Sequence, residues 1–142
     1  MTIAVEKVLY TARATANGGR DGKVATDDGK LDVVVVPPAA MGGSGNGTNP
    51  EQLIAAGWSA CFMSAMQLAA SKMKVALPDD RALDAEVDLG TNEGGFVLRA
   101  RLNVKLPGLR REVAQAVVDA AHQMCPYSKA TRGNIEVEFK VA

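Results

Sequence analysis

The chain has 142 residues and a mass of 14.8 kDa, which is room for one domain with a full hydrophobic core. Its 16 Lys and Arg residues balance 16 Asp and Glu residues, and this neutrality argues against a nucleic-acid-binding module, which needs a basic face. With 47% hydrophobic and 23% charged residues the composition excludes a disordered chain, and aromatic residues at 4% are too few for base-stacking platforms.

The first third of the chain is predicted to form a meander of three strands. Apolar and polar residues alternate over positions 8–16, with the period of two that an extended segment shows. Turn-forming residues follow at 17–22 and 27–30, so the second and third strands are expected at 23–26 and 31–36. The third strand holds a run of four valines, whose β-branched side chains disfavour a helix.

A long helix is predicted to begin after the glycine-rich loop of residues 41–47. Asn49 is a suitable N-cap, Pro50 suits the first helical position and Glu51 suits the positive end of the helix dipole. Positions 52–71 hold no charged residue, which is enough length to span a bilayer. Because polar residues interrupt this stretch, we expect a helix buried inside a soluble protein or between subunits, and no membrane partner.

The next segments are predicted to form a hairpin and an amphipathic helix. Apolar and polar residues alternate over 83–89 and again over 96–106, with turn-forming residues at 91–95 between them. This pattern predicts two strands with one face on the core and one face in water. Apolar residues at helical spacing over 109–124 predict the helix, which Pro126 interrupts.

The last segment, residues 135–141, alternates again and is predicted to be a strand. The order of elements is therefore βββ-α-ββ-α-β. This order predicts an α+β fold with antiparallel sheets. We find no internal repeat and no linker, so a single domain is expected over residues 1–142.

Two cysteines, Cys61 and Cys125, are candidates for chemistry. The first residues lack the pattern of a secretory signal peptide, so we expect a cytoplasmic protein in which both thiols are mostly reduced. A structural zinc site needs about four clustered Cys or His ligands, and the chain adds only His122, so no metal site is expected. The plainest interpretation is that both cysteines are small buried hydrophobic residues, and that His122 lies at the surface.

The predicted elements distinguish the two thiols. Cys61 is expected in the middle of the long helix, where the helix dipole does not lower the pKa of its thiol, so a reactive thiolate requires a cation from elsewhere in the fold. Cys125 is expected at a helix end, which disfavours a thiolate unless Pro126 begins a new helical turn. On electrostatics Cys61 is the better attacking thiol. Arg20 is a candidate cation, although an arginine in such a glycine-rich turn is by default only a solvated hairpin tip.

Helix geometry constrains how Glu51 and Cys61 can cooperate. They are ten positions apart on one helix, so their backbones are separated by about 15 Å. Within one chain they cannot share a pocket by direct contact. If both serve one site, the carboxylate comes from a second copy of the chain. The charge-free helix is also a surface that such a copy would bury, so we infer a homodimer as a hypothesis.

Five segments of the chain resemble one protein family. TNPEQL at 48–53 and AAGWSACF at 55–62 closely resemble the first cysteine motif of the organic hydroperoxide resistance (Ohr) proteins, which belong to the Ohr/OsmC family. CPYSKATRGN at 125–134 resembles the second cysteine motif, and LYTA at 9–12 and GGRDG at 18–22 extend the match. The resemblance covers essentially the whole chain. Joint occurrence of the segments in this order is specific, whereas any one of them alone is not.

The resemblance implies a thiol peroxidase that reduces organic hydroperoxides to alcohols. It also implies long buried helices in an intertwined homodimer, with two sites at the subunit interface. Carried over by motif, Cys61 is the peroxidatic thiol, Cys125 the resolving thiol, and Arg20 and Glu51 the activating pair. The resemblance implies no bound cofactor and an external dithiol reductant, namely a lipoylated protein.

An apolar pocket is expected to bind the substrate. Ile54, Trp58 and Phe62 are predicted to line it and to favour fatty or aryl hydroperoxides over hydrogen peroxide. Trp58 and Tyr127 are otherwise most simply packing or interface residues. Three other functions stay open. They are an OsmC-type peroxidase, a thiol-based stress-binding protein without turnover, and a structural protein with an inert disulfide.

Overall fold

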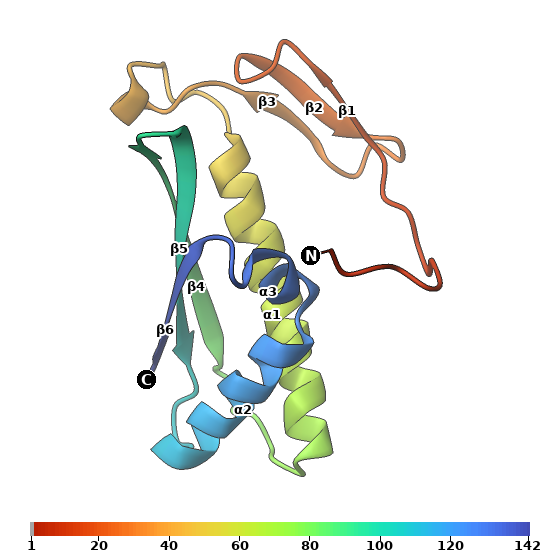
Figure 1. Cartoon of the computed structure of the whole chain (residues 1–142), viewed down its shortest axis with the longest axis vertical. Coiled ribbons are helices and arrows are strands. Elements are labelled where there is room, and N and C mark those ends of the chain that lie inside the picture. Colours follow the sequence, from red (N-terminus) through yellow and green to blue (C-terminus); the bar gives the residue numbers. More distant parts are fainter. Residues whose placement is uncertain (1) are drawn as a thin grey trace. The chain divides into compact units, whose positions relative to one another are not determined.

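The computed structural model describes residues 2–142, and the chain divides into two compact units (Figure 1). The first unit ends at Pro50 and the second is Glu51–Ala142. Each unit has its own three-stranded sheet. The single domain expected over residues 1–142 stays a prediction.

The first unit contains a three-stranded antiparallel sheet in the order β1-β2-β3. Its strands are β1 (Ala14–Asn17), β2 (Gly22–Thr26) and β3 (Asp32–Val35). The predicted meander is therefore confirmed. In the first predicted turn Asp21 donates its N–H to the Gly18 carbonyl at 3.2 Å, and Gly18 and Gly19 have φ values of 81° and 62° that suit glycine.

The first strand is shorter than its alternation predicts. β1 begins only at Ala14, and residues 8–13 lie outside the sheet. The reason is the length of its neighbour, because Ala14 pairs with Thr26, the last residue of β2. Beyond that pair Asp27 donates one more backbone N–H to the Arg13 carbonyl at 3.1 Å, and the residues before Arg13 have no strand opposite them. Alternation predicts an extended chain, whereas a strand also needs a partner.

The segment between β3 and the long helix is closed by backbone hydrogen bonds. It contains a short 3-10 helix, η1 (Ala39–Met41). After the glycine-rich loop the chain returns beside β3. There Val36 donates its N–H to the Thr48 carbonyl at 3.0 Å, and Thr48 donates its own to the Val34 carbonyl at 2.9 Å. These bonds hold the two ends of the loop together.

The predicted long helix is α1 (Pro50–Lys72). It begins at Pro50, as its N-terminal signals predict, with Asn49 preceding it and Glu51 in its first turn. By length and composition alone α1 could cross a membrane, but core helices pass the same test. One side of α1 is buried within the chain, and only a third of its most apolar window is covered. The expectation of a helix buried inside the protein or between subunits is therefore met on one side of α1 within a single chain.

The sheet of the second unit has the order β4-β5-β6. Its strands are β4 (Ala82–Asn92), β5 (Gly95–Lys105) and β6 (Glu136–Val141). The predicted hairpin is confirmed, since β4 and β5 pair antiparallel along their whole length. The antiparallel expectation is wrong for β6, which pairs parallel with β5. A helical crossover lies between them, and such a connection brings the chain back in the same direction.

Two helices form that crossover, α2 (Arg111–Met124) and α3 (Pro126–Thr131). Figure 1 shows α1 and α2 beside the β4-β5-β6 sheet. One face of β5, with Leu102 and Val104 fully buried, packs in a single core with Phe62 of α1 and Val117 of α2. The opposite face of the hairpin carries ion pairs, such as those between Asp88 and its arginine neighbours. The core consists mostly of Ala, Val, Leu and Met side chains, with Trp58 and Phe62 fully buried among them.

Candidate active site

The two cysteines lie together in the second unit. Cys61 is on α1 and Cys125 is between α2 and α3, and Cys125 donates its S–H to the Cys61 sulfur across 3.4 Å. Both thiols are free. Because an S–S bond is about 2.0 Å long, a small movement would join the two sulfurs. Cys61 is only partly buried, whereas Cys125 has 0% exposure.

The position of Cys125 follows from the proline after it. Cys125 ends α2 and precedes α3, with an extended backbone at φ −66° and ψ 123°. Pro126 cannot continue α2 because it lacks an N–H and restricts the residue before it, but it suits the first position of a new helix. The structure therefore contains the new helical turn that the sequence analysis left as an alternative. The break turns the chain at Cys125 and leaves its sulfur against α1.

Burial and hydrogen bonding act in opposite directions on Cys61. Burial, the largest effect, raises the pKa of the Cys61 thiol, and the backbone N–H of Tyr127 lowers it. Neighbouring Cys125 raises it further, and the pKa of Cys61 lies above its ordinary value. The new turn at Pro126 thus acts on Cys61, although sequence reasoning considered it only for Cys125.

The predicted substrate-binding residues follow one side of α1. Trp58 and Phe62 have 0% exposure and belong to the core, and Ile54 packs against it from a partly buried position. The Phe62 ring contacts the Phe139 ring of β6, with the two centroids 5.3 Å apart. These side chains form an apolar wall on the side of α1 that faces the core. Their role in substrate binding stays a prediction.

The predicted activating pair is divided between the two units. Arg20 lies in the turn between β1 and β2, with an exposed side chain. Glu51 is in the first turn of α1, ten positions before Cys61, which corresponds to a rise of about 15 Å along the helix. Both residues therefore lie on one continuous helix, as the sequence predicts. The roles of Arg20 and Glu51 stay predictions.

Comparison with known proteins identifies the family. The model of the OsmC-like protein family matches residues 43–140. A relative from Xanthomonas axonopodis pv. citri, named organic hydroperoxide resistance protein, is 49% identical over 138 residues, covering 96% of this chain and 97% of the relative. The chain belongs to the OsmC-like family, in its organic hydroperoxide resistance (Ohr) branch.

Solved structures of Ohr proteins have the same fold as this chain. The organic hydroperoxide resistance protein OsmC of Legionella pneumophila has a TM-score of 0.90 and 46% identity, with 96% of this chain and 99% of that chain covered. Organic hydroperoxide resistance protein OhrB of Bacillus subtilis has a TM-score of 0.87 and 45% identity, with 95% and 100% covered. The predicted family and the α+β fold are therefore confirmed.

Gly57 lies beside the candidate site, and sequence reasoning missed its role there. A Cβ atom at Gly57 would meet the hydroxyl oxygen of Tyr127 at 2.7 Å, so the glycine lets the Tyr127 side chain lie close against α1. The Tyr127 ring is 6.5 Å from the ring of Trp58, one turn before Cys61. A signal was available, because glycine inside a helix costs about 1 kcal/mol relative to alanine and needs a reason.

His122 also differs from its prediction. We expected a surface residue, but its ring packs edge-on against Phe139 with the centroids 4.6 Å apart. Arg132 donates from Nε to His122 Nε2 at 3.4 Å, and among residues 2–142 the buried Nδ1 has no hydrogen-bond partner. Burial lowers the pKa of His122, Arg132 lowers it further, and Asp119 raises it. The charged form of the imidazole is therefore disfavoured in the folded chain.

This environment makes folding stability depend on pH. Since the folded-state pKa of His122 lies below its ordinary value of 6.5, the unfolded chain binds more protons near that pH. We expect the free energy of unfolding to fall as the pH drops below 6.5 and to level off below the lowered folded value. Urea unfolding between pH 7 and pH 5 measures this slope. The His122→Phe variant keeps the ring contact with Phe139 and should lose the slope, whereas an unchanged slope would contradict the assignment.

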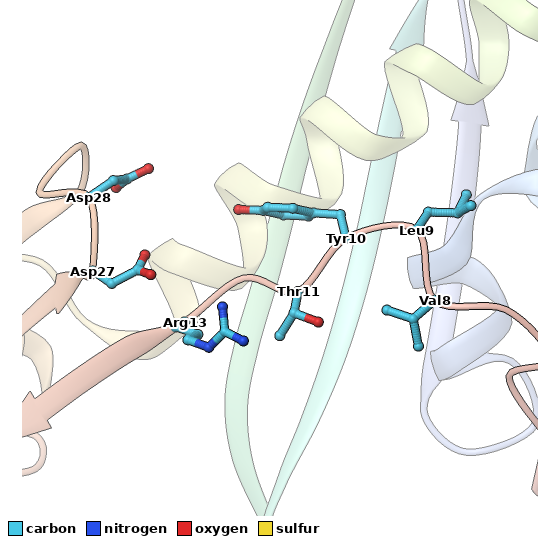
Figure 2. A pocket seen from close by; sticks show the side chains of 7 residues that line it. All are labelled: Val8, Leu9, Tyr10, Thr11, Arg13, Asp27 and Asp28. Atoms are coloured by element: carbon cyan, nitrogen blue, oxygen red, sulfur yellow. The ribbon is translucent and has the colours of Figure 1, made fainter.

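The first unit has an open groove of about 590 Å³, lined by Val8, Leu9, Tyr10, Thr11, Arg13, Asp27 and Asp28 (Figure 2). The first four belong to the extended segment before β1, and the two aspartates lie in the turn after β2. None of the predicted site residues lines this groove. Among residues 2–142, no group of three or more His, Cys, Asp and Glu side chains is arranged to hold a metal ion.

Proposed function

We propose that the chain is a thiol peroxidase that reduces organic hydroperoxides to alcohols through Cys61 and Cys125. The observation that carries the proposal is the 3.4 Å distance between the two sulfurs in a member of the Ohr branch. The names of the relatives, organic hydroperoxide resistance proteins, support a role in peroxide detoxification. The substrate class and the mechanism are our proposal.

The proposed cycle has three balanced steps. The Cys61 thiolate attacks the terminal peroxide oxygen, the O–O bond breaks, and the alkoxide takes a proton and leaves as alcohol. Cys61 is then a sulfenic acid, which condenses with the Cys125 thiol to a disulfide and releases water. An external dithiol exchanges with this disulfide, becomes oxidised itself and restores both thiols. We propose a lipoylated protein as that dithiol and the cytoplasm as the place of reaction.

Exposure supports the assignment of the two thiol roles. Cys61 is partly accessible, so a hydroperoxide can reach it, whereas Cys125 is completely buried. An oxidant therefore meets Cys61 first. Cys125 is already within 3.4 Å, so it can react with the sulfenic acid after a small movement. We also propose a preference for fatty or aryl hydroperoxides, for which the partly buried Ile54 offers an apolar surface, whereas Trp58 and Phe62 lie in the core with 0% exposure.

Activation of Cys61 requires a positive charge. Burial raises the pKa of this thiol, and the single N–H of Tyr127 does not offset that effect. We propose that the Arg20 guanidinium holds the thiolate and that Glu51 orients the guanidinium and balances its charge. Since Glu51 is ten positions before Cys61 on α1, we propose that a homodimer completes the site.

Exposed apolar side chains support the homodimer. Within residues 2–10 five of them have exposed fractions between 68% and 86%, namely Ile3, Val5, Val8, Leu9 and Tyr10. Three of these line the groove in Figure 2. Such a segment is stabilised when a second chain covers it. Sedimentation at working concentration tests this, and a monomer would contradict it.

Arg20→Ala is expected to raise the pKa of the Cys61 thiol. At pH 7 the rate of alkylation falls about tenfold for each unit by which that pKa rises. The measurement is the pH dependence of iodoacetamide alkylation of Cys61, made in a Cys125→Ser background so that one thiol remains. Lys30→Ala, an exposed cation in the same unit, is the matched control and should leave the profile unchanged. Superimposed profiles for Arg20→Ala and its parent would rule out the pairing.

The function is tested by steady-state consumption of cumene hydroperoxide and of hydrogen peroxide. Each is supplied first with a lipoyl dithiol and then with a thioredoxin system. Sustained consumption of the organic substrate, faster than that of hydrogen peroxide, supports the proposal. Oxidation of one equivalent per chain without turnover would instead indicate a stress-binding protein. Unreactive thiols would indicate an inert structural pair.

A further inference from the structure

The chain segment that carries Cys125 is closed by a side-chain contact. Arg132 donates from Nη2 to the carbonyl oxygen of His122 and from Nε to His122 Nε2 at 3.4 Å. We call this contact the Arg132–His122 clasp. It joins residues ten positions apart, so the loop that it closes contains Cys125 and the whole of α3. The carbonyl that it binds is one of the last four of α2, which no helical N–H satisfies.

The clasp is attached to the core beside Cys61. The His122 ring packs on Phe139 of β6 with the centroids 4.6 Å apart, and Phe139 packs on Phe62 at 5.3 Å. Phe62 is the residue after Cys61 on α1. The end of α2 is therefore held in the same aromatic cluster as the neighbour of the reactive sulfur. A movement of His122 would therefore change its packing on Phe139, and through Phe139 the packing on Phe62.

α3 needs such support because it is short. A helix of six residues is not stable by itself in water. At its end, the backbone N–H of Arg132 binds the Ser128 carbonyl at 2.9 Å. Ser128 is fully buried, but among residues 2–142 its Oγ has no hydrogen-bond partner. The clasp is thus the side-chain hydrogen bond that ties the end of α3 back to α2.

The start of α3 presents two groups to Cys61. One is the Cys125 sulfur at 3.4 Å, and the other is the backbone N–H of Tyr127, which lowers the pKa of Cys61 against the effect of burial. A hydrogen bond weakens steeply when its angle changes. Both contacts therefore depend on how α3 is oriented. Since the clasp fixes the far end of α3, it also sets the orientation of its start.

We propose that Arg132 and His122 are positioning residues that hold α3 so that Tyr127 and Cys125 face the Cys61 sulfur, and that they thereby set the reactivity of that sulfur. Neither residue touches the reacting atoms. The inference rests on the proposed function only in taking Cys61 as the reactive thiol. The competing explanation is that Arg132 merely caps the end of α2, in which case its loss lowers stability and leaves Cys61 unchanged.

The test measures Cys61 without any peroxide. In a Cys125→Ser background Cys61 is the only thiol, and its alkylation by iodoacetamide is followed from pH 6 to pH 10. Arg132→Gln is expected to move the midpoint upward by about half a pH unit, which is roughly a threefold slower reaction at pH 7. Arg132→Lys keeps a charge and one donor for the His122 carbonyl. Its alkylation profile should therefore lie between that of the parent and that of Arg132→Gln.

Arg111→Gln is the matched control, because this arginine is exposed at the opposite end of α2. Its alkylation profile should coincide with that of the parent. The thermal unfolding temperature of each variant separates stability from reactivity. A profile of Arg132→Gln that superimposes on the parent would overturn the proposal, whatever its unfolding temperature. Should Arg132→Gln fail to fold, Arg132→Lys and His122→Phe decide, and unshifted profiles in both would overturn it equally.

This result is separate from the outcome of the peroxidase assay. Alkylation needs neither a hydroperoxide nor a reductant, so it reports the positioning of Cys61 alone. A chain without turnover whose Cys61 profile still responds to Arg132 would retain this inference and lose the proposed function. A chain that turns over hydroperoxide but whose Cys61 profile does not respond to the loss of Arg132 would retain the proposed function and lose this inference.

Discussion

Replacing Cys61 by serine is expected to abolish the consumption of organic hydroperoxide, down to the uncatalysed background. The proposed first step needs a polarisable thiolate, and a serine hydroxyl is neither ionised near neutral pH nor able to form a sulfenic acid. Because Cys61 is only partly buried, the substitution changes one atom in a position that tolerates it. Loss of activity therefore reports chemistry and not unfolding.

The measurement is hydroperoxide consumption with excess dithiol, together with thermal unfolding of the variant. Ser64→Ala is a suitable control, since Ser64 is exposed on the same helix and holds no proposed role. Its rate should equal that of the parent chain. Substantial turnover by Cys61→Ser would remove Cys61 as the nucleophile, and with it the proposed mechanism.

Replacing Cys125 by serine is expected to preserve the first oxidation and to stop the cycle after about one equivalent of hydroperoxide. Without a neighbouring thiol at 3.4 Å, the Cys61 sulfenic acid has no partner for condensation. It then accumulates or is oxidised further to the sulfinic acid, which a dithiol does not reduce. Mass spectrometry of the intact chain should detect one added oxygen atom and then a second.

The burial of Cys125 calls for a paired variant. The side chain has 0% exposure, so a serine hydroxyl there adds a buried polar group, which costs about 1–3 kcal/mol when it finds no partner. Cys125→Ala avoids that cost and should give the same oxidation products. A catalytic cycle of normal rate in both variants would show that Cys125 does not resolve the sulfenic acid.

Local patterns predicted most of the fold. Asn49, Pro50 and Glu51 located the start of α1 because capping preferences are properties of single residues. Period-two alternation located β4, β5 and β6 for the same reason. The direction of β6 was not accessible in this way. Whether a strand pairs parallel or antiparallel depends on where the crossover returns the chain, and that is decided by packing.

The sequence predicted that the two cysteines act together, and the structure places them 3.4 Å apart, but the contacts around them were not predictable. Helix position indicated Cys61 as the better nucleophile, and motif resemblance supplied Cys125 as its partner. The N–H of Tyr127, the close approach at Gly57 and the clasp at His122 are tertiary contacts. Each contact joins the segment at α3 either to α1, which is distant in the sequence, or to α2, on the other side of the helix interruption at Pro126. No periodicity within a single segment carries such information.

The single tryptophan of the chain has a consequence for following the reaction. Trp58 is completely buried, lies one helical turn before Cys61 and is near the Tyr127 ring. Its indole emission therefore samples the immediate surroundings of the sulfur pair and nothing else in the molecule. Thiols, thiolates and disulfides quench an excited indole to different extents. The chain should thus signal its own oxidation state optically, in real time and without a label.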